Sequence, residues 1–538
     1  MNDTKNKQNS PRLQERYSTR HAVLNYYLIL MFTVFPLFAS NAYFNIRHDK
    51  YYFFLALTGV VVIAEAVMMY FAYCGSKKEK SPEMVVGDGS IRLNFSFTDW
   101  AMIALLVVCI ISTIFSNQTS EALFGSPKGR NSGLILIAFY VGIYFVITRC
   151  YYYMEYVFVA LAAGSAIVYL LSVLNFCYID PLGMYAQLNA STIEDFTSTI
   201  GNKNLMSSFI CVMLPVVITM SVHTQKTLYR IIYLAASALG FMALMTADSD
   251  SGILGIGVFI VIMLIWYSRK ITRLKRYFLC LTVMLASAKI LQLFAFILKQ
   301  SFGCKTKEID QFQKLFVESN IGFVLIAVAA LITGVLYIID MKKPNLTLSK
   351  AVPIVLGSLF AAAVIAVLSA VVYFSCFDTE TKLGSLTSIL RFNEKWGTHR
   401  GFMWIKSFDI FGDASFFQKL FGTGPDTFHY AFSPYFTELM KYGDSSTNAA
   451  HNEYLNYLIT IGAFGLIAYL SVVGGTIAGA IKKSFSNPLS IVCVSAVICY
   501  SVQAVVNIAQ PITTPLFILF VALTEAVSRS NTGHNELV

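Results

Sequence analysis

The segment that decides the fold is "AVPIVLGSLFAAAVIAVLSAVVYFSC", residues 351–376, which contains no charged side chain. It exceeds the roughly 20 apolar residues that a helix needs to cross a membrane. Its apolar residues do not alternate with polar ones, as those of a barrel strand would, and in lipid an isolated segment satisfies its own backbone only as a helix. Similar runs recur along the chain. We therefore predict an all-α polytopic membrane protein.

The composition agrees with this class. Of the 538 residues, 56% are hydrophobic and 13% are charged, whereas a soluble domain has about a quarter charged residues. The net charge of +10 comes from basic residues clustered in short loops between apolar runs, so we expect no nucleic-acid partner. The ten cysteines show no zinc-binding spacing, and we predict no metal and no cofactor. We expect no removable signal peptide, so the first span would itself be the targeting element.

Fourteen candidate spans can be placed along the chain. They centre near residues 23–42, 52–74, 99–116, 132–148, 156–176, 203–222, 230–247, 252–268, 277–298, 320–340, 351–376, 454–480, 489–508 and 513–528. Closely spaced pairs are the easiest to miscount, so about 12–14 transmembrane helices are expected.

The loops between the spans predict the orientation. Alternate loops such as "SRKITRLKR" (268–276) and "IKKSFSNP" (481–488) are basic, while the connections 178–202 and 248–251 have almost no basic residues. The positive-inside rule then places both termini in the cytoplasm. The predicted division is a cytoplasmic tail (1–22), transmembrane helices 1–11 (23–376), a large extracytoplasmic loop (377–450), the C-terminal transmembrane helices (451–528) and a second cytoplasmic tail (529–538).

The loop 377–450 is far longer than an ordinary connection, and such loops are usually functional or disordered. Within it, "HRGFMWIKSFDIFGDASFFQKLFG" (399–422) has apolar residues at helical spacing. This pattern predicts an amphipathic helix that lies on the membrane surface or over the mouth of a cavity.

His451 lies where this loop meets the next apolar run, in "AAHNEYLNYL" (449–458). One interpretation is a polar helix start, since such residues are common caps. The other is a general base, because a neutral imidazole can take a proton from a hydroxyl. Arg391 and Arg400 lie in the same loop, either as solvated anchors or as forked contacts to a phosphate or pyrophosphate.

Further polar residues fall on the same side of the membrane in this topology. Arg130 is either a third phosphate contact or an anchor at a span end. Asn202 would cap the helix that follows it, and Asp248 and Asp250 fit a solvated turn better than catalysis. Inside the apolar spans, either Glu65 and Lys289 pair with each other or Lys289 extends its charged end toward the membrane surface; the sequence leaves their role open.

Several motifs recur in one order. The stretch His451, Asn452, Leu455, Gly462 and Gly465 follows the pattern "HNxxLxxxxxxGxxGL", and Arg391, Arg400 and Trp404 precede the turn "GTGPDTF" (422–428). Upstream lie "GNKNLMSSFICVMLP" (201–215) and "FGSPKGRNSGL" (124–134). This order, over about residues 124–470, resembles the O-antigen ligase-related family, which holds O-antigen ligases and polysaccharide polymerases.

The resemblance implies a GT-C-like fold and a glycosyltransferase of surface polysaccharide biosynthesis in the bacterial cytoplasmic (inner) membrane. Its donor would be a glycan on undecaprenyl pyrophosphate and its acceptor a hydroxyl of a glycan or glycolipid, with no metal or nucleotide. Membrane lipids are implied partners, and chain-length regulators and flippase proteins are further candidate partners. The implied catalytic residues are His451, Arg400 and Arg391, and the implied substrate-binding residues are Arg130, Asn202, Lys203, Asn204, Asn452 and Trp404.

The implied chemistry suits these residue types. Pyrophosphate is a good leaving group, so the enzyme chiefly needs positive charge and a base for the acceptor hydroxyl, and displacement at the anomeric carbon would invert its configuration. In one place the sequence departs from the family: many members have Ser-Arg where this chain has Ser249-Asp250. Since that arginine belongs to the ligase pattern, its absence favours a polymerase over a ligase.

Two other classes of protein compete with this interpretation. A flippase or other transporter of lipid-linked oligosaccharides would have a similar number of spans, but paired repeats and broken helices near the midplane are expected of it. The sequence shows no such repeats. A non-catalytic scaffold for polysaccharide assembly is disfavoured by the histidine and arginine cluster alone.

Overall fold

A computed structural model of the chain describes residues 11–42, 44–78, 95–126, 130–484 and 487–529. Within these residues the fold is helical, apart from one antiparallel pair of two-residue strands. The elements are α1 (Pro11–Leu37), α2 (Ile46–Lys78), α3 (Phe97–Ile114), α4 (Thr119–Phe124), α5 (Leu134–Cys150), α6 (Glu155–Phe176), α7 (Ala190–Asp195), β1 (Phe196–Thr197), η1 (Ser198–Ile200), β2 (Gly201–Asn202), α8 (Lys203–His223), α9 (Thr227–Thr246), α10 (Asp250–Tyr267), α11 (Ile271–Phe302), α12 (Gln311–Val317), α13 (Ile321–Lys342), α14 (Ala351–Cys376), η2 (Gly384–Leu386), α15 (Thr387–Leu390), α16 (Trp396–Asp413), α17 (Phe416–Phe421), α18 (Phe428–Phe432), η3 (Ser433–Tyr435), α19 (Phe436–Leu439), η4 (Met440–Tyr442), α20 (Glu453–Thr460), α21 (Gly462–Lys483), α22 (Leu489–Gln503), η5 (Ala504–Val506) and α23 (Thr514–Arg529).

Eleven helices of the described chain are long and apolar enough to cross a membrane. They correspond to eleven of the fourteen expected spans, and α1, α5 and α23 correspond to the other three. Of these three, α5 is apolar but only 17 residues long. The prediction of an all-α polytopic membrane protein is confirmed.

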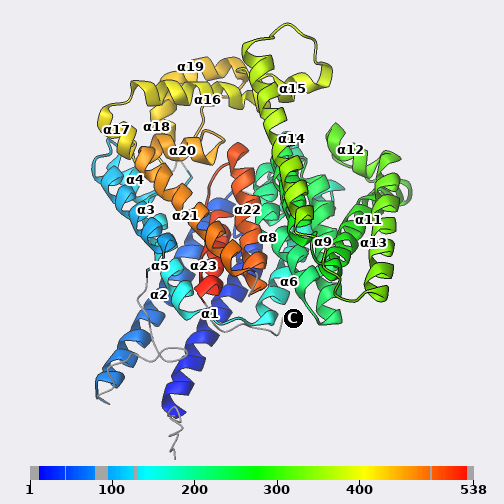
Figure 1. Ribbon diagram of the computed structural model, residues 1–538. Coiled ribbons are helices and arrows are strands. Elements are labelled where there is room, and N and C mark those ends of the chain that lie inside the picture. The colour runs from blue at the N-terminus through cyan, green and yellow to red at the C-terminus, as the bar shows by residue number, and fades with distance from the viewer. Residues whose placement is uncertain (1–10, 43, 79–94, 127–129, 485–486, 530–538) are drawn as a thin grey trace, which may run out of the picture.

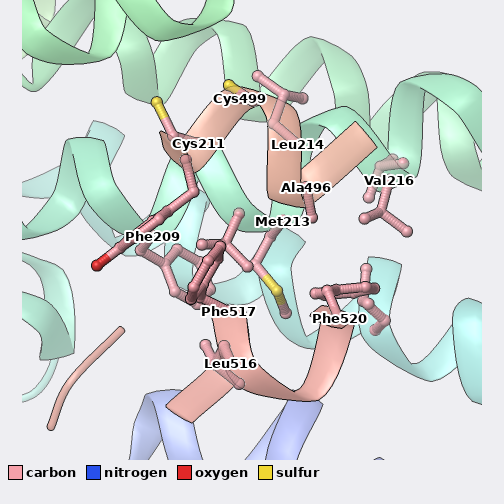
Figure 2. Packing of buried hydrophobic residues seen from close by; sticks show 14 of the residues in the cluster. Phe209, Cys211, Met213, Leu214, Val216, Ala496, Cys499, Leu516, Phe517 and Phe520 are labelled. Atoms are coloured by element: carbon pink, nitrogen blue, oxygen red, sulfur yellow. The ribbon is translucent and has the colours of Figure 1, made fainter. Parts of the chain in front are cut away.

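The bundle is built around α8. From Met206 to His223 every residue of this helix is buried, which is typical of a helix with neighbours on all sides. Figure 2 shows Phe209, Met213 and Leu214 of α8 close to Phe517 of α23 and Ala496 of α22. The central position of α8 fixes the place of its N-terminus, where Asn202 begins the helix.

The periphery looks different. None of the residues of α14 is buried, as expected of a helix that faces lipid. The two charged residues predicted inside apolar spans do not pair with each other. Glu65 accepts a hydrogen bond from Arg20 at 2.8 Å, and Lys289 donates to the carbonyl groups of Val317 and Ser319 at 2.8 and 2.7 Å.

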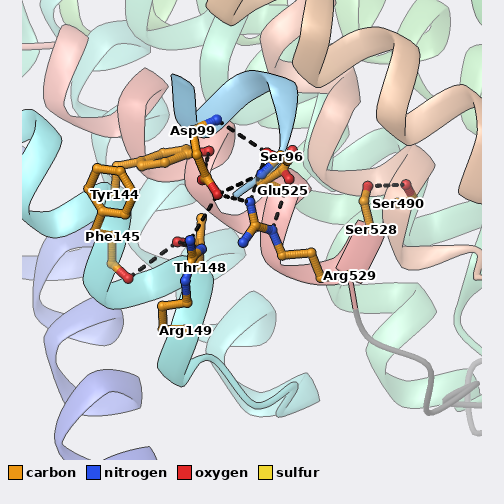
Figure 3. A network of polar contacts seen from close by, with 10 residues as sticks. All are labelled: Ser96, Asp99, Tyr144, Phe145, Thr148, Arg149, Ser490, Glu525, Ser528 and Arg529. Carbon is orange, nitrogen blue, oxygen red and sulfur yellow. Dashed lines mark hydrogen bonds and ion pairs between the residues drawn. The ribbon is translucent and has the colours of Figure 1, made fainter. Parts of the chain in front are cut away.

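The start of α1 and the end of α23 lie toward one end of the bundle, which we call the terminal end, and α15–α19 lie across the other (Figure 1). At the terminal end a buried carboxylate joins three helices. Asp99 of α3 accepts hydrogen bonds from Tyr144 and Arg149 of α5, each at 2.8 Å, and from Arg529 of α23 (Figure 3).

We call residues 384–450 the cap. Its helices have a small hydrophobic core of their own with the start of α20, made of Phe402, Met403, Phe428, Phe432, Leu439, Ala450, Leu455 and Ile459. The amphipathic helix predicted over 399–422 is present as two helices. The break between them lies at Ser415, which is the N-cap of α17: its hydroxyl accepts a hydrogen bond from the amide of Gln418.

Two turns of the family-like motifs contact each other at the cap end. A Cβ atom on Gly422 would lie 2.3 Å from the backbone of Thr460, and one on Gly462 would lie 2.4 Å from the backbone of Leu420. Both glycines also have positive φ, +78° and +71°, a conformation that other residues rarely adopt. This contact fixes α17 against the junction of α20 and α21.

Candidate functional site

His451 lies at the junction of the cap and α20. Its φ of 51° is in the left-handed region, which is uncommon for a residue with a side chain and often marks a functional constraint. Two contacts hold the backbone around it. The indole of Trp404 donates to the carbonyl of Ala450 at 3.0 Å, and the side chain of Asn452 accepts from the amide of Leu455 at 3.0 Å, capping α20.

The next residue, Glu453, anchors the start of α20 in the bundle. Its buried carboxylate accepts hydrogen bonds from Tyr469 of α21 at 2.6 Å and from Tyr500 of α22 at 2.9 Å. Burial raises the pKa of Glu453 to about 7, against the effect of the tyrosine hydroxyls. His451 is therefore attached on one side to the cap and on the other to two helices of the bundle.

Two arginines act on the imidazole of His451. Burial, which has the larger effect, and the positive charges of Arg130 and Arg400 together lower its pKa to about 3. The free protein thus holds His451 as a neutral imidazole at physiological pH, in a field that favours anions.

The turn that carries Arg130 is bound to the cap by Asp426. The carboxylate of Asp426 accepts from the backbone amides of Ser126 and Arg130, each at 2.8 Å. Burial lowers the pKa of Arg130 to about 9, and the nearby charge of Arg47 contributes in the same direction. The Nε atom of Arg130 is buried and has no hydrogen-bond partner among the described residues. This donor is available to a ligand.

Arg47, near the start of α2, is a site residue that the sequence analysis missed. It lines a cavity of about 250 Å³ together with Arg130, Asn202, Asn204 and His451. We call this the arginine cavity. One signal for Arg47 was present: in the orientation predicted from the sequence, it falls on the side of the membrane where the positive-inside rule leaves few basic residues.

A second cavity, of about 300 Å³, lies on the cap side of His451. Its polar lining is formed by His429, Asp444, Ser446, Thr447, Asn448 and His451. We call this the cap cavity. His451 lines both cavities, so it can contact a ligand in either of them.

The structure gives the other predicted site residues the following places. Asn202 caps α8 by accepting from the amide of Leu205 at 2.9 Å, and Asn204 accepts from the hydroxyl of Ser249 at 3.0 Å. Both line the arginine cavity. Lys203 forms an ion pair with Asp248 at 2.9 Å.

Arg391 and Arg400 differ in their surroundings. The guanidinium of Arg391 donates to the backbone carbonyl groups of Phe374, Asp378 and Thr381, at 3.2, 3.2 and 2.9 Å. Arg400 is half-buried at the start of the regular part of α16. Burial lowers the pKa of Arg400, and the negative charge of Asp250 partly offsets this effect by raising it. The carboxylate of Asp250 is therefore within electrostatic reach of Arg400.

Fold and site together define a polytopic helical membrane protein with a histidine and several arginines beneath a folded cap. Residues 315–470 match the family model described as O-antigen ligase. The chain therefore contains an O-antigen ligase domain, which extends from α12 into α21 and includes Arg391, Arg400, Trp404, His451 and Asn452. No curated protein matches the chain.

Proposed function

We propose that the protein is a membrane glycosyltransferase that moves a glycan from undecaprenyl pyrophosphate to a sugar hydroxyl at the extracytoplasmic face of the cytoplasmic membrane. The observation that carries this proposal is that His451 lines the same cavity as Arg47 and Arg130. Guanidinium groups suit a pyrophosphate diester because they keep their charge and donate in pairs.

The reaction can be written with these residues. The acceptor oxygen forms a bond to the anomeric carbon while the bond from that carbon to the pyrophosphate oxygen breaks, and undecaprenyl pyrophosphate leaves with the electron pair. Nε2 or Nδ1 of His451 takes the hydroxyl proton. Arg130, Arg400 and Arg47 stabilise the charge that develops on the leaving group, which is the role that a metal ion has in other transferases. We propose inversion at the anomeric carbon and no need for a metal.

The low pKa of His451 fits a base that becomes active when the donor is bound. A pyrophosphate diester brings about two negative charges, which offset the charges of Arg130 and Arg400. Since these arginines contribute to the low pKa of His451, donor binding raises it. The imidazole then becomes a stronger base in the complex that needs one.

The remaining predicted residues receive supporting roles in this proposal. Arg391 orders the segment that enters the cap through its three carbonyl contacts. Trp404 and Asn452 position His451. Trp404 does so through its hydrogen bond to the carbonyl of Ala450, and Asn452 by accepting from the amide of Leu455. Asn202 and Asn204 bind the donor in the arginine cavity, and Lys203 holds the turn at Asp248 next to them.

We further propose a polymerase rather than a ligase, because Asp250 lies where the ligase pattern has an arginine and its charge acts on Arg400. Loss of the ladder of chain lengths in a deletion strain would support a polymerase. A polymer that is made but never attached would support a ligase.

The decisive experiment is glycan analysis of cells that express the wild type, His451→Ala and Arg400→Ala at matched protein levels. Removal of a general base typically costs about 10²–10⁴-fold in rate, so little full-length glycan is expected from His451→Ala. His399→Ala is the matched control, since His399 is a cap histidine whose ring packs against that of Tyr442 in a tilted arrangement, with ring centroids 4.8 Å apart. Wild-type glycan from His451→Ala would contradict the proposed mechanism.

A further inference from the structure

We propose that the cap cavity is the binding site for the acceptor sugar, while the arginine cavity binds the donor pyrophosphate. This inference rests on the glycosyl transfer proposed above and assigns one substrate to each cavity. The starting observation is that His451 lines both of them.

The two cavities differ in charge. Arg47 and Arg130 line the arginine cavity, whereas the cap cavity has the carboxylate of Asp444 and no lysine or arginine in its lining. A carboxylate repels a pyrophosphate, so the donor's charged group is disfavoured in the cap cavity. The same carboxylate accepts hydrogen bonds from hydroxyl groups and therefore suits a polyol.

The neutral lining also suits a sugar. Ser446 and Thr447 offer hydroxyl groups, Asn448 offers an amide and His429 an imidazole, so the cavity presents both donors and acceptors. A contact between the Nδ1 atom of His429 and the carbonyl of Thr447, at 3.2 Å, holds the lining together. The hydroxyl of Thr447 also donates to the carbonyl of Ala449 at 2.9 Å, which connects this lining to the backbone beside His451.

The geometry of displacement gives an independent argument. In an in-line displacement the nucleophile and the leaving group lie on opposite sides of the reacting carbon. The base must contact the nucleophile, within about 2.6–3.2 Å of the proton-bearing oxygen. With the pyrophosphate beside Arg130, the acceptor hydroxyl has to approach His451 from the other side. The cap cavity fits this requirement, because His451 lines it and its lining includes neither Arg47 nor Arg130.

It follows that residues 444–448 determine which acceptor is used. Asp444 and Ser446 are exposed, so substitutions there are expected to leave the packing of the cap unchanged. Asp444 and Ser446 can therefore change between related proteins without disturbing His451 or the arginines.

The test uses the full-length protein in lipid nanodiscs. The donor is the lipid-linked glycan purified from a host strain that lacks this protein, and the acceptor is the glycan-bearing envelope fraction of the same strain. For Asp444→Ala and Ser446→Ala, transfer is measured with donor and acceptor varied in turn, and binding of undecaprenyl pyrophosphate is measured separately. Lys441→Gln, an exposed cap residue outside the lining, is the control.

Asp444→Ala is expected to raise the half-saturating amount of acceptor about tenfold, as fits the loss of a hydrogen bond to a charged group, and Ser446→Ala by a smaller factor. Both should bind undecaprenyl pyrophosphate within about twofold of the wild type, which also shows that they fold. Arg130→Gln should instead weaken the binding of undecaprenyl pyrophosphate and leave the half-saturating amount of acceptor unchanged. The inference is wrong if Asp444→Ala leaves the acceptor requirement unchanged or weakens undecaprenyl pyrophosphate binding instead. If His451→Ala transfers glycan normally, the proposed function itself fails.

Discussion

At the scale of single residues, the imidazole of His451 is influenced by two guanidinium groups that are not bonded to it. With a pKa of about 3, the imidazole of His451 is a weak base toward an acceptor hydroxyl in the free protein. The base and the leaving-group site therefore cannot be treated as independent, because a charge bound at one changes the proton affinity of the other.

A pH profile tests this coupling. The value of kcat/KM for the donor reports the protein before donor binding, and kcat reports the complex. Because bound pyrophosphate raises the pKa of His451, protonation should inactivate the complex at a higher pH than the free protein. We expect kcat to fall on the acid side with a midpoint above that of kcat/KM.

Removing a neighbouring charge should shift the same profile. In Arg400→Gln the pKa of His451 rises in the free protein, since Arg400 is one of the charges that lower it. The acid limb of kcat/KM should move to higher pH and approach that of kcat. Identical acid limbs for kcat and kcat/KM in the wild type would contradict the coupling.

Asp426 is the second residue whose replacement gives a defined expectation. Asp426→Ala leaves the buried amides of Ser126 and Arg130 without this acceptor. The expected loss in the free energy of unfolding is about 2 kcal/mol, measured by thermal unfolding of the detergent-solubilised protein. Donor affinity should fall too, because the turn no longer holds Arg130. Asp426→Asn, which keeps one acceptor oxygen, should lie between the wild type and Asp426→Ala in both measurements.

Some of the site was accessible from the sequence. The order of motifs singled out His451, Arg130, Asn202 and Asn204, and the structure places all four around one cavity. The role of Asp426 could not be predicted, because its partners are backbone amides about 300 residues earlier in the chain. No side-chain pattern announces such a contact.

At the scale of secondary-structure elements, the contact of Gly422 with the α20–α21 junction is the tightest test of the fold. Gly462→Ala adds a methyl group 2.4 Å from the backbone of Leu420 and forces alanine into a φ of +71°. Overpacking and backbone strain together should cost about 2–4 kcal/mol. Glycan synthesis should fall with it, because this junction supports His451.

Gly474→Ala is the matched control in the same helix, α21. A Cβ atom there meets nothing within 4 Å, and alanine favours a helix over glycine by up to about 1 kcal/mol. Unfolding of both variants can be followed by the loss of far-ultraviolet circular dichroism on heating. Equal stability of the two variants would show that the close approach of the turns is absent.

The cap shows where periodicity stops being informative. The spacing of apolar residues correctly indicated a helical segment over 399–422, yet the helix is interrupted at Ser415. It also starts irregularly, since Gly397, Thr398 and His399 have positive φ. An apolar stripe averages over such breaks, and the hydrogen bonds that create them involve single residues.

At the scale of the whole molecule, the arrangement of the ends makes the predicted orientation testable. A membrane-impermeant maleimide should label Ser445→Cys in intact spheroplasts, because this exposed cap residue would face outward. It should label Lys343→Cys, an exposed residue between α13 and α14, only after the membrane is permeabilised. Cys74, Cys304 and Cys376, which are not buried, are replaced by serine in both. The reverse labelling pattern would place the site in the cytoplasm.

The class of fold was predictable because lipid imposes one solution on each long apolar run. The arrangement of the helices was not, because apolar residues on a lipid-facing helix and on a buried one look alike. α14 and α8 both have high mean hydropathy, 2.6 and 2.2. However, α14 has no buried residue, whereas 94% of the most apolar 18-residue stretch of α8 is buried.

The carboxylate of Asp99 connects α3 to α23, two helices that lie far apart in the sequence. Arg149 is made about 50 residues after Asp99, but Arg529 follows 430 residues later. During synthesis the carboxylate can therefore pair with its first guanidinium early and must wait for the last helix to receive the second. A chain that terminates before Arg529 leaves the carboxylate without its second guanidinium, so this junction of α3, α5 and α23 forms only after α23 has been made.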